Sequence, residues 1–371
     1  MDDIVKEKLL TILGPEHFLT DEGACRLASQ DISCTSDFTV KAVMRPLDKQ
    51  ALASIVKICV HAGYALFPRG GGMSYTSGYL PSEEKSFSID MSCMAKVVEI
   101  NVKDMFVTVE AGCTWADLYE ALKGTGLRTP YWGTLSGLKA TVGGSVSQNS
   151  IFFGSGLYGT AADSVIGLEV VMADGEIITT GSAAQRNSGP FLRHYGPDLT
   201  GLFTSDSGSL GIKATITLKL ISKVPHVAFT SFSFPDHASM FTAASEVSRR
   251  GLACEAFGFD PYLQAQRMKR ESLAQDLKVL GNVMKSSGSV FGAIKDAAKI
   301  ATAGRRYMDD VPFSFHFTTE NHNQVAAQEA IAEINSICKG AGGTKIENSI
   351  PKIIRSNPFM PLNNMVGPQG E

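Results

Sequence analysis

Three glycine-rich tracts hold the residues of this sequence whose types and spacing best suit chemistry. The first tract, residues 67–78 (FPRGGGMSYTSG), sets three consecutive glycines between Arg69 and Ser74. Glycine loses the most conformational freedom on folding, so three together indicate that a bare backbone is needed. Successive backbone N–H groups can form a concave anion site, with Arg69 and Ser74 as further donors. A pyrophosphate fits this pattern, and a tight hairpin loop is the alternative.

Two later tracts repeat the combination of glycine with small hydroxyl residues. They are residues 140–149 (ATVGGSVSQN) and residues 206–212 (DSGSLGI). Three such tracts in one region would let an extended ligand approach the backbone closely at several points along the length of the ligand. This arrangement suits a long ligand better than a single phosphate.

A fourth stretch, residues 154–159 (GSGLYG), matches the G-x-G-x-x-G pattern of dinucleotide-binding folds, with Asp174 following Gly154 by 20 residues. That fingerprint must follow a strand and open a helix. Residues 145–153 do not read as a strand, and a strand at 165–172 follows soon afterwards. We therefore do not expect a nicotinamide-binding Rossmann site.

The elements around the tracts alternate between helix and strand. Apolar spacing predicts a helix over 48–63, followed by a brief strand that leads into the first tract. Further strands are expected at 85–90, 95–101, 105–111, 165–172, 176–180 and 212–221, and a helix at 114–122.

The pattern changes beyond Pro225, and we place a domain boundary near residues 223–226. Strands are expected at 227–234, 253–259 and 312–318, and helices at 235–251 and 323–338. Residues 284–308 are expected to form a helical insertion or a mobile segment, and we favour a helix with a solvated face. In residues 313–318, alternation puts the phenylalanines on one face and Ser314, His316 and Thr318 on the other.

Composition restricts the class of protein. At 371 residues, 44% of them hydrophobic, the chain can bury a large core and form two domains. A net charge of -3 gives no general attraction to nucleic acid or to anionic membranes. The seven cysteines include no C-x-x-C pair, and the N-terminus has no signal pattern, so we expect reduced thiols and a cytoplasmic protein.

Five ordered segments resemble a known family. They are residues 68–78, 90–122, 140–149, 158–182 and 196–220, and together they look like the FAD-binding domain of the vanillyl-alcohol oxidase and p-cresol methylhydroxylase superfamily. Within it, the likeness is greatest to the D-lactate dehydrogenase and glycolate oxidase flavoprotein branch. The resemblance covers about residues 38–221.

The resemblance implies an α+β fold in three parts. Residues 1–37 would be an N-terminal helical segment, and residues 38–224 a PCMH-type FAD-binding domain of two α+β subdomains. Residues 225–371 would be a ferredoxin-like α/β cap for the substrate, incomplete at its C-terminus because the family's histidine-rich metal and base motif does not occur before Glu371. We therefore expect a truncated product and assign no metal ligand.

The resemblance also implies FAD as the cofactor. No covalent attachment is expected, because Met73 and the pair Lys139–Ala140 stand where tethering relatives have histidine or cysteine. A side chain at Gly71 would enter the space where a phosphate oxygen meets backbone N–H groups. The expected FAD-binding residues are Pro68, Arg69, Gly70, Gly71, Gly72, Met73, Ser74, Tyr75, Thr141, Val142, Gly143, Gly144, Ser147, Asn149, Gly154, Tyr158, Gly159, Asp163, Gly208, Gly211 and Ile212.

Four residues are candidates for catalysis on a flavin. Tyr75 and Tyr158 could bind a substrate oxygen, or pack on the cofactor or core. His316 could bind a carboxylate or act as a base, although we favour a solvent-facing strand histidine. Arg355 could hold a carboxylate through two hydrogen bonds.

The expected function is oxidation of a small 2-hydroxy acid of the D-lactate or glycolate type by hydride transfer to FAD. The alternatives are a phenolic or aromatic alcohol oxidase, and an FAD-binding subunit or fragment that does not turn over alone. The expected partners are the substrate and an electron acceptor, which would be oxygen, a quinone, a cytochrome or an electron-transfer protein. A homo-oligomer is compatible with the sequence.

Overall fold

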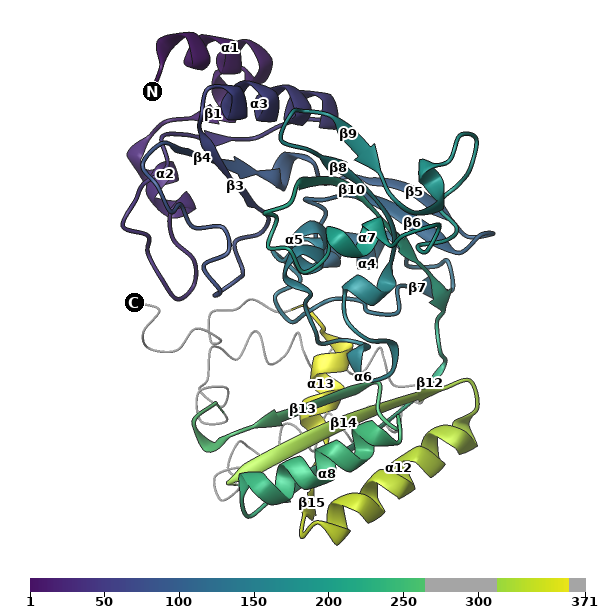
Figure 1. Cartoon of the computed structure of the whole chain (residues 1–371). Helices are drawn as coiled ribbons and strands as arrows, with labels where there is room; N and C mark the ends of the chain where they lie inside the picture. Colours follow the sequence, from purple (N-terminus) through teal and green to yellow (C-terminus); the bar gives the residue numbers. More distant parts are fainter. Residues whose placement is uncertain (264–311, 360–371) are drawn as a thin grey trace. The chain divides into compact units, whose positions relative to one another are not determined.

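The computed structural model describes residues 1–263 and 312–359. The expected helical segment at 284–308 lies outside the described residues. Contacts divide the chain into two units (Figure 1). The first unit comprises residues 1–151 and 159–222, and the second comprises Phe152–Tyr158 and the described residues from Lys223 onward. The return of Phe152–Tyr158 to the second unit was not expected from the sequence.

The first unit begins with helix α1 (Asp3–Leu13), which buries Val5, Leu9 and Leu13. The short helix α2 (Glu22–Ala28) follows, and α3 (Lys49–His61) begins at Asp48, whose side chain accepts a hydrogen bond from the N–H of Ala51. The first sheet has the order β1-β2-β4-β3. Its strands are β1 (Phe18–Leu19), β2 (Val43–Met44), β3 (Ala65–Arg69) and β4 (Ser86–Asp90). Strand β4 runs parallel to both β2 and β3.

The second sheet of this unit is antiparallel, with the order β5-β6-β10-β8-β9. Its strands are β5 (Val97–Asn101), β6 (Phe106–Glu110), β8 (Val165–Val171), β9 (Ile177–Thr179) and β10 (Ile212–Lys219). The unit also contains helices α4 (Trp115–Ala121), α5 (Val142–Gln148) and α7 (Leu199–Leu202) and the strand pair β7 (Leu127–Arg128) and β11 (Ile221–Ser222).

The second unit is built on a four-stranded antiparallel sheet of order β13-β14-β12-β15. Its elements are α6 (Ser155–Tyr158), β12 (His226–Phe234), α8 (His237–Arg249), β13 (Glu255–Phe259), β14 (Phe313–Asn321), α12 (Gln324–Gly340), β15 (Thr344–Ile346) and α13 (Ser349–Ser356). The described chain order strand, helix, strand, strand, helix, strand with this sheet order is ferredoxin-like. The expected α+β fold class is therefore confirmed.

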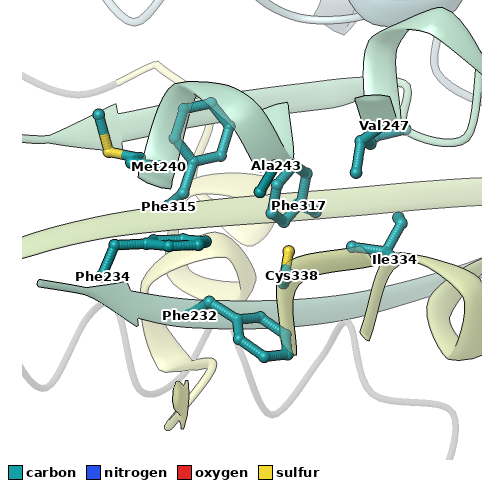
Figure 2. Packing of buried hydrophobic residues seen from close by; sticks show 10 residues of the cluster. Phe232, Phe234, Met240, Ala243, Val247, Phe315, Phe317, Ile334 and Cys338 are labelled. Atoms are coloured by element: carbon teal, nitrogen blue, oxygen red, sulfur yellow. The ribbon is translucent and has the colours of Figure 1, made fainter. Parts of the chain in front are cut away.

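The core of the second unit lies between the sheet and helices α8 and α12. Figure 2 shows Phe315 and Phe317 of β14 packed with Met240 and Ala243 of α8 and Ile334 of α12. This agrees with the alternation expected for residues 313–318. None of the described helices has the length and apolar character needed to cross a membrane.

Candidate functional site

The three glycine tracts meet around one cavity in the first unit, with a volume of about 340 Å³. This size falls within the range of small-molecule sites. The expected residues that line the cavity are Pro68, Arg69, Gly70, Gly71, Gly72, Met73, Ser74, Tyr75, Thr141, Gly143, Gly144, Ser147, Asn149, Gly208, Gly211 and Ile212. Residues that lie 140 positions apart in sequence therefore surround one space.

The first tract leaves the carboxyl end of β3, whose parallel pairing with β4 holds Arg69 opposite Asp90. Among the described residues, the backbone N–H groups from Gly70 to Met73 have no hydrogen-bond acceptor. These donors are available to a bound anion.

The glycines are also required by the neighbouring tract. A Cβ atom on Gly71 would lie 1.7 Å from the backbone oxygen of Lys139, and one on Gly70 would lie 2.4 Å from Oγ1 of Thr141. The backbone of the first tract thus packs directly against the backbone of the second tract. The sequence expectation, which reserved the space at Gly71 for a phosphate oxygen, missed this contact.

The second tract forms helix α5, an element that the sequence analysis did not predict. Thr141 caps α5, because its Oγ1 accepts a hydrogen bond from the N–H of Gly144 at 3.1 Å. Gly143 packs closely on the end of β6, since its Cβ would lie 2.7 Å from the carbonyl oxygen of Ala111. Val142 is fully buried and does not line the cavity, so its expected cofactor contact is not supported by its position.

The third tract is held against α5 by main-chain and side-chain bonds. The N–H of Ser205 donates to Val146 O at 3.0 Å, and that of Ser207 donates to Ser147 O at 2.9 Å. Gln148 connects all three tracts: its Oε1 accepts from Thr76 Oγ1 at 3.0 Å, and its Nε2 donates to Ser207 Oγ at 3.4 Å. Gln148 lies inside the tract singled out in the sequence, but its side-chain partners only became evident in the fold.

The cavity favours an anion. Arg69 and Lys213 are the charged side chains among the described residues that line it, and no acidic side chain does so. Arg69 Nη1 donates to Gln30 O at 2.9 Å, and its guanidinium lies 4.7 Å from the ring centre of Tyr79. Burial raises the pKa of the Tyr79 phenol to about 12, and its hydroxyl donates to Ser74 O at 3.2 Å.

Four further expected FAD-binding residues are not among the residues that line the cavity. Gly154 and Tyr158 belong to the second unit, where the N–H of Tyr158 donates to Gly154 O at 3.0 Å in the short helix α6. Gly159 and Asp163 belong to the first unit but do not line the cavity. Asp163 accepts hydrogen bonds from the N–H and Oγ1 of Thr160 at 2.7 and 2.9 Å, so it closes a local turn. No strand leads directly into residues 154–159, which argues against a Rossmann site there.

His316 is not the solvent-facing histidine that the sequence favoured. It is fully buried in β14, which has β12 on one side and β13 on the other. Its Nδ1 lies 2.9 Å from Ser231 Oγ, and its Nε2 lies 3.2 Å from Ser314 Oγ. Burial lowers the pKa of His316 to about 3, so the ring is neutral near pH 7. The face of β14 that the alternation predicted to be polar is buried. The local sequence pattern could not indicate this burial.

Arg355, the candidate for binding a substrate carboxylate, is engaged with carboxylates of its own chain. From α13 its guanidinium forms ion pairs with Glu255 of β13 and Glu320 of β14. Cys254, Glu255 and Glu320 place possible metal ligands within 4.8 Å of one another, but Arg355 already supplies the positive charge at both carboxylates. Of the four catalytic candidates, Tyr75 is the one that lines the cavity, and it is 70% exposed.

Comparison with known families and proteins agrees with this geometry. Residues 40–181 match the FAD binding domain family. The chain is 34% identical over 221 residues to the glycolate oxidase subunit GlcD of Bacillus subtilis, which covers 59% of this chain and 45% of that protein. It is 33% identical over 194 residues to a mitochondrial cytochrome-type D-lactate dehydrogenase of Arabidopsis thaliana. This match covers 52% of this chain and 32% of that protein. The chain therefore spans less than half the length of these two relatives.

Solved structures share the fold. Substrate-bound p-cresol methylhydroxylase superposes with a TM-score of 0.75 at 16% identity, over 98% of this chain and 70% of that one. The 4-ethylphenol oxidase of Gulosibacter chungangensis superposes with a TM-score of 0.74 at 17% identity, with the same coverage. Because the identities are low, these likenesses concern the fold alone.

Proposed function

We propose that the chain, whose residues 40–181 match the FAD binding domain family, is an FAD-dependent oxidoreductase that oxidises the CH–OH group of a small 2-hydroxy acid of the D-lactate or glycolate type. The observation that carries the proposal is the cavity of three glycine tracts, where the described lining residues include two cationic side chains and no acidic one. The substrate class is supported by the names of the two curated relatives.

The residues of the cavity fit FAD. The N–H groups of Gly70 to Met73 and the cationic side chains suit a diphosphate, and the close packing at Gly71 and Gly143 keeps the tracts in one arrangement. No histidine or cysteine side chain of the described chain lines the cavity, which supports non-covalent binding. When bound, FAD supplies the hydride acceptor, while the protein orients the substrate and handles the proton.

Tyr75 is the residue that we assign to substrate binding at the cavity. The residue is 70% exposed, and its hydroxyl group can donate a hydrogen bond to a substrate oxygen. His316 is a poor base in the described arrangement, because both ring nitrogens face serine hydroxyls and burial disfavours its protonated form.

A second candidate function is an FAD-binding subunit or fragment that does not turn over alone. This candidate is favoured because the chain matches 45% of the length of one curated relative and 32% of the length of the other. In either case we propose a separate electron acceptor, and a cytoplasmic location remains our proposal.

Anaerobic mixing of the FAD-loaded protein with D-lactate, glycolate and a 4-alkylphenol separates these functions. Loss of the visible absorbance of oxidised flavin with a hydroxy acid supports the main proposal, and loss with the phenol alone replaces it by an alcohol oxidase. Tight FAD binding without bleaching by any of them supports the subunit or fragment. Failure of the purified apoprotein to bind FAD would remove all three.

A further inference from the structure

Lys213 is a cation that lines the cavity and yet is almost completely buried. Its side chain is 3% exposed, and its Nζ lies 2.6 Å from Oδ1 of Asp206, whose own side chain is 2% exposed. Oδ1 of Asp206 also accepts a hydrogen bond from the N–H of Gly208 at 3.0 Å. The ion pair therefore closes the third glycine tract from Asp206 to the start of β10.

The backbone at Lys213 departs from the regular ladder. The pairing of β10 with β8 shifts register between Lys213 and Thr215. Such bulges re-aim a side chain that a regular strand would direct elsewhere, and they are common beside functional sites. Here the bulge occurs where Lys213 reaches the cavity lining.

Stability alone is a weak reason for this ion pair. Burying two charges costs desolvation energy that their attraction often fails to recover, and apolar replacements of similar volume are often equally stable or better. Burial lowers the pKa of Lys213, and Asp206 opposes that shift and favours the ammonium. A cation beside a cavity whose described lining residues include no acidic side chain is better explained by an anionic ligand.

Arg69, the other cationic side chain among the described residues that line the cavity, already makes contacts within the protein. Its guanidinium donates to Gln30 O and lies over Tyr79, and a Cβ on Gly72 would approach its Nη2 to 2.4 Å. Arg69 thus braces the first tract, while the described partner of the Lys213 ammonium is Asp206.

We propose that Lys213 is an FAD-binding residue whose ammonium faces the diphosphate of the cofactor, and that Asp206 is the positioning residue that holds it there. This inference rests on the proposed function, because it requires FAD in the cavity. It predicts that the positive charge at residue 213 governs cofactor affinity separately from the stability of the fold.

The test is a titration of apoprotein variants with FAD, followed by flavin fluorescence, together with thermal unfolding of each apoprotein. Lys213→Met should raise the Kd for FAD about tenfold or more, because it removes a charge-assisted hydrogen bond. Lys213→Arg should retain most of the affinity. Lys219→Met, on the same strand but outside the cavity lining, is the matched control and should leave the Kd unchanged.

The double variant Asp206→Asn, Lys213→Met separates binding from folding. It leaves no unpaired buried charge, and the new amide oxygen can still accept from Gly208, so apoprotein stability should return to the wild-type level or above it. FAD affinity should nevertheless stay as low as in Lys213→Met. Recovery of affinity along with stability would show that the ion pair is only structural and would overturn the inference.

Other outcomes are also decisive. A wild-type protein that binds FAD and a Lys213→Met variant that binds equally well would overturn the inference and leave the proposed function intact. Wild-type FAD binding without oxidation of any hydroxy acid would instead refute the proposed substrate and leave Lys213 in its role.

Discussion

At the scale of single residues, Gly71 shows how close packing and ligand binding share one position. A side chain at Gly71 meets the carbonyl of Lys139 before it meets any ligand, because the Cβ would lie 1.7 Å from that oxygen. The two tracts must separate to admit even a methyl group.

Gly71→Ala should therefore reduce both apoprotein stability and FAD affinity, with a stability cost of about 1–3 kcal/mol, as is typical of overpacking. Thermal unfolding and FAD titration of the same preparation check this. Gly340→Ala is the control, because a Cβ there meets nothing within 4 Å. A Gly71→Ala protein with normal stability and reduced affinity would restore the earlier interpretation, in which only the ligand needs the space.

His316 predicts an acid dependence of stability. Its folded pKa of about 3 lies below the value of about 6.5 expected in the unfolded chain. Between these values the unfolded state binds more protons, so this residue's contribution is fully present above about pH 6.5 and is lost as the pH falls toward 3. The loss is about 1.4 kcal/mol per pH unit within that window.

Melting temperatures from pH 7 to pH 4.5 should thus fall more steeply in the wild type than in His316→Gln, which keeps a polar side chain facing Ser231 and Ser314. Parallel curves for the two proteins would mean that His316 is protonated without opening the fold.

At the scale of elements, α5 presents Thr141 and the paired glycines to the cavity. Thr141→Val removes the cap on the N–H of Gly144 and should cost about 1 kcal/mol of stability. FAD affinity should fall as well, because the capped turn forms part of the cavity lining.

Thr114 provides the matched control, because it caps α4 in the same way, accepting from the N–H of Asp117 at 3.1 Å, and does not line the cavity. Thr114→Val should show a similar loss of melting temperature with an unchanged Kd. An equal loss of affinity in both variants would indicate that affinity simply follows stability.

The same elements show what the sequence could predict. Periodicity located α3, β8, β10, β12 and α12 to within a few residues, because each has an apolar face that repeats along the chain. Helix α5 was missed since Gly143 and Gly144 lower helix propensity, and only its packing on Ala111 explains why glycine is needed.

Tertiary placement was the larger difficulty. Local pattern could not show that the polar face of β14 is buried, that Arg355 meets Glu255, or that Lys213 closes the third tract on Asp206. Each of these features depends on the tertiary surroundings of the residue, which a local sequence pattern does not encode.

At the scale of the whole molecule, the cavity lies entirely within the first unit. A ligand that binds only the folded state stabilises it by about 2.7 kcal/mol when its concentration is a hundred times Kd. FAD at that concentration should slow hydrogen exchange most strongly in residues 69–76, 139–149 and 205–213, where the three tracts meet. Exchange in β14 of the second unit should change little, because its backbone bonds belong to a separate sheet.

Mass spectrometry of exchanged peptides, with and without FAD, measures both regions in one sample. Lys213→Met at the same FAD concentration is the internal comparison and should show weaker protection in the tracts. Protection confined to β14 would move the cofactor site out of the first unit and would contradict both the cavity assignment and the role of Lys213.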